Sequence, residues 1–122
     1  MGTTDSATVV TAELMHRFNE VFLRHDPSAL RGMIAEDCVI EKINPAPDGD
    51  RCVGRDACVA LWTEIATAPG TRFDLEETCA MGDRAIIRWR FSSADATSIR
   101  GANLMRVRDG LIVEAMGYVK GA

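Results

Sequence analysis

The feature that most constrains this chain is an alternation of apolar and polar residues after residue 72. In residues 85–91 two arginines separate the apolar side chains, which are Ala85, Ile87, Trp89 and Phe91. A period of two is typical of β-strands, because successive side chains face opposite sides of a sheet. Gly82-Asp83 and Asp109-Gly110 are turn signals between such segments. We therefore predict a meander of strands over about 73–81, 85–91, 99–107 and 111–120.

The first part of the chain repeats with a helical period. Leu14, Phe18, Val21 and Phe22 are spaced by three or four positions, which predicts a long helix that ends at Asp26-Pro27. Its N-cap candidates are Thr4, Asp5 and Ser6. The elements expected next are a short helix carrying Leu30, Met33 and Ile34, a strand over 38–43, a loop over 44–50 and a helix over about 55–67. Helices followed by an antiparallel sheet define an α+β fold.

The composition is that of an ordinary globular protein. The chain has 122 residues, 47% of them hydrophobic, and a net charge of −4, which fits one domain over residues 1–122. An acidic balance disfavours nucleic-acid binding, and the apolar runs are too short for a membrane-spanning helix. Residues 1–30 lack the basic start and apolar core of a signal peptide, so we expect a cytoplasmic protein.

No motif for a cofactor or a metal is present in the sequence. The four cysteines (Cys38, Cys52, Cys58 and Cys79) lack the spacing of a zinc site, and we expect them to be reduced. The chain has no glycine-rich phosphate or dinucleotide motif, and its carboxylates lack metal-ligand spacing. We therefore expect neither a cofactor nor a metal.

The order of these segments resembles the nuclear transport factor 2-like superfamily, and most closely its SnoaL-like branch. After the long helix, the stretches that carry the resemblance are HDPSALRGMIAEDCVIE, GRDACVALW, GDRAIIRWRF and GANLMRVRDGLIVEAMGYVKG. The resemblance implies a cone-shaped, curved, mixed or antiparallel sheet wrapped around the N-terminal helix, as a conical barrel with an apolar pocket, and often a dimer. The superfamily includes ketosteroid isomerases, polyketide cyclases, dehydratases, epoxide hydrolases and binding modules, so the fold alone does not select a function.

The ketosteroid isomerase pattern can be placed on this chain residue by residue. The resemblance places the base aspartate of the isomerase at Lys42, its helix tyrosine at Phe18 and its protonated aspartate at Asn103. Lysine is normally charged and phenylalanine cannot donate a hydrogen bond, so only Asn103 keeps its donor. This residue set therefore disfavours steroid isomerisation. No histidine lies in the predicted sheet to form the constellations of related cyclases and epoxide hydrolases.

Three polar residues fall at apolar positions of their strands, and we take them as the candidate catalytic residues. They are Lys42, Glu77 and Asn103. In a shared pocket Glu77 would be a general base, and the other two would stabilise an oxyanion. Each also has a structural interpretation. Lys42 would reach the rim of the cone, Glu77 would lie on a bulge or past the pocket edge, and Asn103 would bond to a neighbouring backbone group.

The expected pocket wall is aromatic and apolar, although the same side chains could be ordinary core. Its candidate residues are Phe18, Phe22, Trp62, Trp89, Phe91, Met105, Met116 and Tyr118. In the last strand both faces are apolar, so the sequence does not decide which one faces the pocket.

Two functions fit these observations. The first is a cofactor-independent enzyme that cyclises, isomerises or dehydrates an apolar carbonyl compound. The alternative is a binding or carrier module for a small apolar molecule. We also expect a homodimer, because Ala102 and Leu104 face outward among arginines, and an apolar strip with a charged rim suits a two-fold interface.

Overall fold

The structure is a computed structural model that describes residues 5–121. Its helical elements are α1 (Ser6–Leu23), the short 3₁₀ helix η1 (Leu30–Met33) and α2 (Arg55–Thr67). Its strands are β1 (Ile34–Glu41), β2 (Arg51–Val53), β3 (Arg72–Met81), β4 (Arg84–Ser92), β5 (Ser98–Arg108) and β6 (Leu111–Val119). Among these residues no helix is long and apolar enough to cross a membrane.

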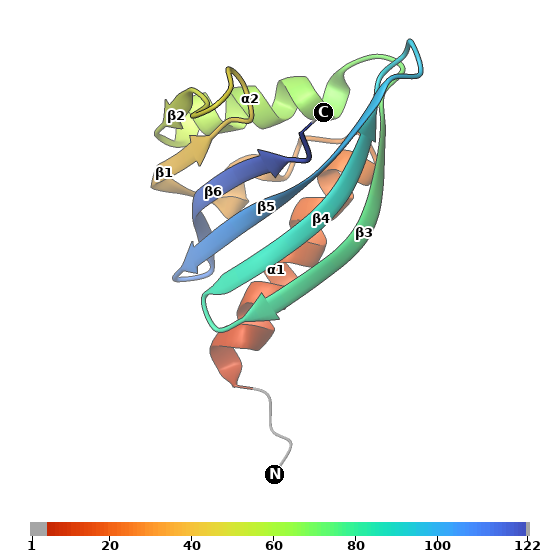
Figure 1. Cartoon of the computed structure of the whole chain (residues 1–122). Helices are drawn as coiled ribbons and strands as arrows, with labels where there is room; N and C mark the ends of the chain where they lie inside the picture. Colours follow the sequence, from red (N-terminus) through yellow and green to blue (C-terminus); the bar gives the residue numbers. More distant parts are fainter. Residues whose placement is uncertain (1–4, 122) are drawn as a thin grey trace.

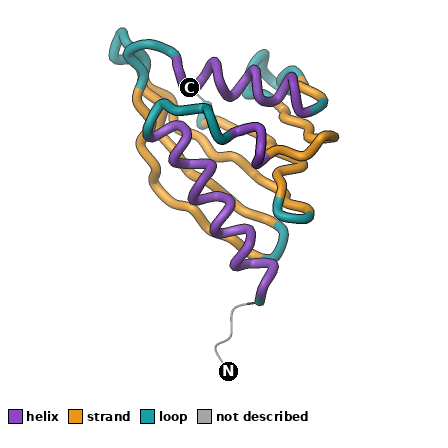
Figure 2. The backbone as a smooth tube through the Cα atoms, turned by 180° about the vertical axis from the view of Figure 1, so that it is seen from behind, coloured by secondary structure: helices purple, strands orange, loops and turns teal. Residues whose placement is uncertain are grey.

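The strands form one curved sheet with the order β2-β1-β6-β5-β4-β3 (Figure 1). Strands β1 and β6 run parallel and the other neighbours run antiparallel, so the sheet is mixed. Seen from behind, α1 crosses one face of the sheet while α2 lies beyond the end of α1 (Figure 2). The predicted α+β cone is therefore confirmed. The sheet stays open, because β2 and β3 are its two edges and do not pair with each other.

Helix α1 begins where the sequence signals predict and ends at Leu23, three residues before the predicted stop at Asp26-Pro27. Asp5 is the N-cap, and its carboxylate accepts a hydrogen bond of 2.9 Å from the backbone N–H of Thr8. The apolar stripe that includes Leu14 and Phe18 is buried against the sheet. Thr4, another N-cap candidate, lies outside the described residues.

The first two strands differ from the prediction. Strand β1 begins at Ile34, which the apolar spacing places in the preceding short helix, and it ends at Glu41 rather than at residue 43. It ends there because the backbone N–H of Lys42 turns to the Asp50 carbonyl oxygen, 2.8 Å away, and closes the loop that follows. The sequence does not predict strand β2. It has only three residues, all exposed or half-buried, and so short a segment shows no alternation of apolar and polar side chains.

A bulge in β3 overturns the expected orientation of Glu77. Leu75 pairs with Trp89, but Glu77 pairs with Arg88, so the register shifts by one residue between them. An extra residue in one strand moves every later side chain to the opposite face. The prediction that Glu77 shares the face of Leu75 is therefore wrong, and the alternative of a bulge is confirmed.

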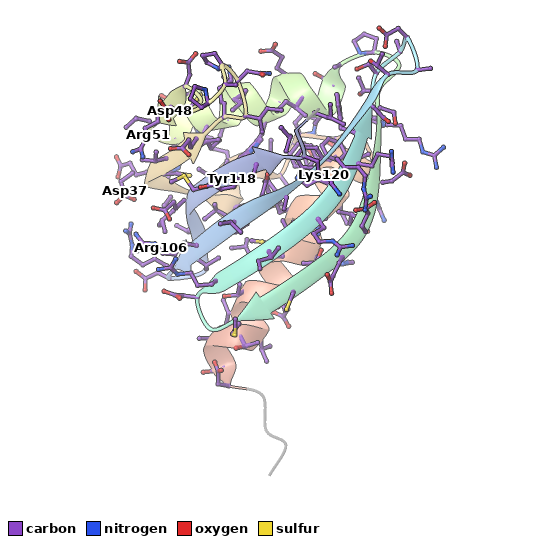
Figure 3. All side chains as sticks on the ribbon, in the orientation of Figure 1. Asp37, Asp48, Arg51, Arg106, Tyr118 and Lys120 are labelled. Atoms are coloured by element: carbon purple, nitrogen blue, oxygen red, sulfur yellow. The ribbon has the colours of Figure 1, made fainter. Side chains whose placement is uncertain are left out.

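Strand β6 turns its smallest residues toward α1. Ala115 pairs with Met105 and Gly117 pairs with Asn103, so these residues occupy the concave face. Met116 and Tyr118 consequently face the other way, and Tyr118 is 55% exposed on the outer surface (Figure 3).

Candidate small-molecule pocket

A cavity of about 390 Å³ lies between the concave face of the sheet and the two long helices. Much of its wall is aromatic, with rings from α1, α2 and the two strands β3 and β4. The Phe18 and Trp62 rings contact edge to face with centroids 4.8 Å apart, and the Phe73 and Trp89 rings do so at 5.8 Å. Such contacts fix the rings and leave an apolar surface toward the cavity.

The structure brings most of the predicted wall to this cavity. Five of the expected residues line it, namely Phe18, Phe22, Trp62, Trp89 and Phe91. Met105 is buried in the core and is not part of the lining. Met116 and Tyr118 lie on the outer face, because the register of β6 points Ala115 and Gly117 inward.

Asn103 lies in the lining with a fixed amide orientation. The indole nitrogen of Trp89 lies 3.2 Å from Oδ1 of Asn103. An indole N–H can only donate, so the amide must turn its oxygen toward Trp89. Within residues 5–121 no group accepts a hydrogen bond from Nδ2 of Asn103. Two N–H donors therefore remain available at the cavity.

The floor beside Asn103 is left open by Gly117. A Cβ at this position would lie 3.6 Å from Oδ1 of Asn103 and 3.0 Å from Cγ2 of Ile43. A larger residue in β6 would fill the space between β1 and β5. Ala115 and Gly117 thus give the cavity its depth next to the free amide.

Lys42 is the only lysine of the lining, and it is half-buried. It follows β1 and continues the inward alternation of Cys38 and Ile40, both of which are buried. Across the described part of the chain, no carboxylate forms an ion pair with its ammonium group. The lining thus holds one cation that no carboxylate of the described residues pairs with.

The third predicted catalytic residue is not at the cavity. Glu77 is exposed on the outer face, where its Oε1 lies 3.6 Å from a guanidinium nitrogen of Arg88. The carboxylates that do border the cavity are Glu41 and Glu64. Glu41 pairs with Arg51 of the neighbouring strand at 3.3 Å. The structure therefore brings together Lys42 and Asn103 but not Glu77.

Sequence reasoning missed one buried polar residue of this wall. Asn19 of α1 is 7% exposed, and its Nδ2 donates to Oγ1 of Thr78 over 3.0 Å. Its position four residues after Met15 and three before Phe22 was a usable signal, since such spacings lie on one helix face. This bond ties α1 to β3 beside the cavity.

The cysteines lie apart from the cavity. Cys38 and Cys58 are buried between β1 and α2, and the Sγ of Cys58 donates to the Cys38 carbonyl oxygen over 3.5 Å. Burial is the main cause that raises the pKa of both thiols. In residues 5–121 no group of three or more histidine, cysteine or acidic side chains is placed to hold a metal ion.

Comparisons with known proteins agree on the family and the fold. The profile of the SnoaL-like domain family matches residues 15–115. An NTF2-like protein of unknown function from Mesorhizobium loti is 66% identical, with a TM-score of 0.95 and 98% of each chain covered. A steroid delta-isomerase from Pseudomonas aeruginosa is 16% identical, with a TM-score of 0.77, over 92% of this chain and 80% of that one. A protein with a cystatin-like fold from Methylobium petroleophilum is 13% identical, with a TM-score of 0.78, over 94% and 78%. No curated protein matches the sequence.

Proposed function

The chain belongs to the SnoaL-like domain family, and on that premise we propose that its cavity binds a small apolar molecule through an oxygen atom of that molecule. The observation that carries the proposal is the free amide of Asn103. Trp89 occupies its oxygen, so its N–H donors suit a carbonyl or carboxylate oxygen. The aromatic wall would hold the apolar body, as is usual in small-molecule sites.

A second candidate is acid/base conversion of such a molecule by cyclisation, isomerisation or dehydration. It is favoured by Lys42 and Asn103, which border one cavity and could both stabilise an oxyanion. This reaction requires a general base. Glu77 cannot serve as that base, because its side chain is exposed on the outer face of the sheet and does not border the cavity. Glu64, on α2, is the carboxylate of the lining without an ion pair among the described residues.

A fluorescence titration with benzylacetone, a small apolar ketone, tests the binding function. Both tryptophans of the chain, Trp62 and Trp89, line the cavity, so a bound ligand should change their emission. We expect saturable binding that Asn103→Leu weakens about tenfold, since one lost hydrogen bond costs about 1–3 kcal/mol. The control is Glu77→Gln, which should bind as the wild type does. No saturable change in the wild type, or equal affinity in Asn103→Leu, contradicts the proposal.

The same ketone separates binding from turnover. Abstraction of a proton next to its carbonyl, in deuterated water, exchanges that proton for deuterium, which nuclear magnetic resonance detects. An enzyme should accelerate this exchange over buffer, and Asn103→Leu should lower the rate by about 10²–10³-fold, the scale of one lost oxyanion donor. Binding without accelerated exchange assigns the pocket to a binding or carrier module.

The outer face of the sheet is the proposed interface of a homodimer. Ile86, Leu104 and Tyr118 are 43%, 44% and 55% exposed there. Arginine and glutamate share this face, and Arg100 donates to Glu76 over 2.9 Å. A surface that carries both charges beside apolar side chains can pair with its own copy across a two-fold axis.

A further inference from the structure

We infer that the ligand of this cavity is an anion, an apolar molecule whose carboxylate pairs with Lys42. The inference rests on the proposed binding function and adds the charge of the ligand. It starts from Lys42, a cation for which residues 5–121 supply no counter-ion, at the border of an otherwise largely apolar cavity.

The environment of Lys42 favours a negatively charged partner. The side chain is half-buried among apolar lining residues, and removing a charged group from water is costly unless it is paired. Of the two carboxylates in the lining, that of Glu41 already pairs with Arg51 at 3.3 Å. Glu64 is exposed on α2 and forms no ion pair with Lys42 in the described part of the chain. A ligand carboxylate would supply the missing partner.

The sheet places the two donors so that one carboxylate can use both. Lys42 continues β1, Asn103 belongs to β5, and β6 runs between them. Two strand spacings separate their backbones by about 10 Å. The residue of β6 opposite Asn103 is Gly117, which puts no side chain of its own between them, and the Ile43 side chain borders this space. A flexible lysine can cross part of this distance, whereas the Asn103 amide is held by Trp89.

A carboxylate uses these donors better than a neutral ketone does. It has two oxygens, one for the N–H of Asn103 and one for the ammonium of Lys42. Hydrogen bonds between charged groups are about twice as strong as neutral ones. We therefore expect the pocket to prefer an acid over the ketone of the same shape.

Hydrocinnamate and benzylacetone are a matched pair for the test, because they differ only in a carboxylate against a methyl ketone. We expect wild-type protein to bind hydrocinnamate at least about tenfold more tightly than benzylacetone, and high salt to reduce this preference. Lys42→Met should lower the affinity for hydrocinnamate at least about tenfold more than the affinity for benzylacetone, and so abolish the preference. The chain has one other lysine, Lys120, which is exposed. Lys120→Met therefore removes the same charge from the surface and should leave both affinities unchanged.

A labelling experiment on the wild-type protein keeps the test independent of any variant. Acetic anhydride acylates lysine amines, and mass spectrometry of the peptides reports Lys42 and Lys120 separately. Saturating hydrocinnamate should slow acylation of Lys42 severalfold and leave Lys120 unchanged. Binding of both compounds with equal affinity, or no protection of Lys42, overturns the inference and leaves the proposed function standing. Binding of neither compound overturns the proposed function itself.

Discussion

Trp89 of β4 donates its indole N–H to Oδ1 of Asn103 in β5 over 3.2 Å, although the two residues do not face each other in the strand register. The residue opposite Trp89 is Gly101. A Cβ there would lie 2.9 Å from two carbons of the indole ring, so glycine makes room for the ring to lie across β5. Gly101, Trp89 and Asn103 thus act together to set the direction of one amide.

Replacing Trp89 by phenylalanine should therefore weaken the pocket through Asn103. Trp89→Phe keeps an aromatic ring and removes the N–H, which leaves the amide free to rotate. We expect the affinity for benzylacetone to fall severalfold and the free energy of unfolding to fall by about 1 kcal/mol, the net value of one hydrogen bond. Calorimetry is the suitable measurement, because the variant also removes a fluorophore.

Trp62→Phe is the control for this change. It makes the same substitution in the same lining but leaves the bond between Trp89 and Asn103 intact. An equal loss of affinity in both variants would show that the indole only fills space.

The elements of this fold could be predicted because their periods are long and regular. Helix α2 runs from Arg55 to Thr67 as expected, and β3–β6 lie within one or two residues of the predicted strands. The position of Asn103 on the concave face followed from the same alternation, since no bulge interrupts the pairing of β4 with β5.

The face of the sheet to which a side chain points could not be predicted where one residue breaks the alternation. The bulge between Leu75 and Glu77 carries no glycine or proline that would reveal it, so parity alone placed Glu77 inside. In β6 both faces are apolar, and only pairing with β5 shows that Gly117 rather than Tyr118 faces the cavity. Such choices depend on partners distant in the sequence, which local pattern does not contain.

The buried thiols predict how stability depends on pH. Burial raises the pKa of Cys38 and Cys58, so they stay protonated in the folded chain at a pH where unfolded thiols, with a pKa of about 8.5, ionise. The folded state then holds more protons than the unfolded state. The free energy of unfolding should be constant with respect to these groups below about pH 8.5 and should fall as the pH rises above it.

Urea unfolding at about pH 7 and about pH 10 measures this difference. The double variant Cys38→Ala/Cys58→Ala should lose less stability between the two conditions than the wild type, whatever its absolute stability. Cys79→Ser changes an exposed thiol and should keep the wild-type difference. The same difference in all three proteins would refute the explanation.

If the proposed dimer forms, its mass in solution should be twice that of the monomer, and a charge placed in the interface should restore the monomer mass. The monomer has a mass of 13.3 kDa, so light scattering at micromolar concentration should give twice that value. Leu104→Arg puts a further positive charge on a face that already carries Arg88 and Arg106, and we expect it to dissociate the dimer. Val53→Arg is the control, because Val53 is 67% exposed on edge strand β2. A monomer mass for the wild type would rule out this interface.

In the loop after β1, Gly49 packs against the backbone of Lys42, and we expect it to control the position of Lys42. Gly49 has a φ of +78°, and a Cβ on it would overlap the carbonyl oxygen of Lys42. The loop is closed by the backbone bond from Lys42 to Asp50 and by one of 2.7 Å from Gly49 to the Pro45 carbonyl. Alanine at position 49 therefore has to displace this backbone, and the ammonium of Lys42 should move with it.

We expect Gly49→Ala to lower the free energy of unfolding by more than the roughly 1–2 kcal/mol that a left-handed conformation costs a residue with a side chain. Gly82→Ala supplies the comparison, because Gly82 has a φ of +61° but nothing within 4 Å of its Cβ position. Urea unfolding measures the free energy of unfolding of both variants. The loss in Gly82→Ala reports the backbone strain alone, and any greater loss in Gly49→Ala reports the overlap with the Lys42 carbonyl oxygen. Gly49→Ala should also weaken hydrocinnamate binding while sparing benzylacetone, because only the anion needs Lys42. If a folded Gly49→Ala protein binds hydrocinnamate as tightly as the wild type, the loop does not position Lys42.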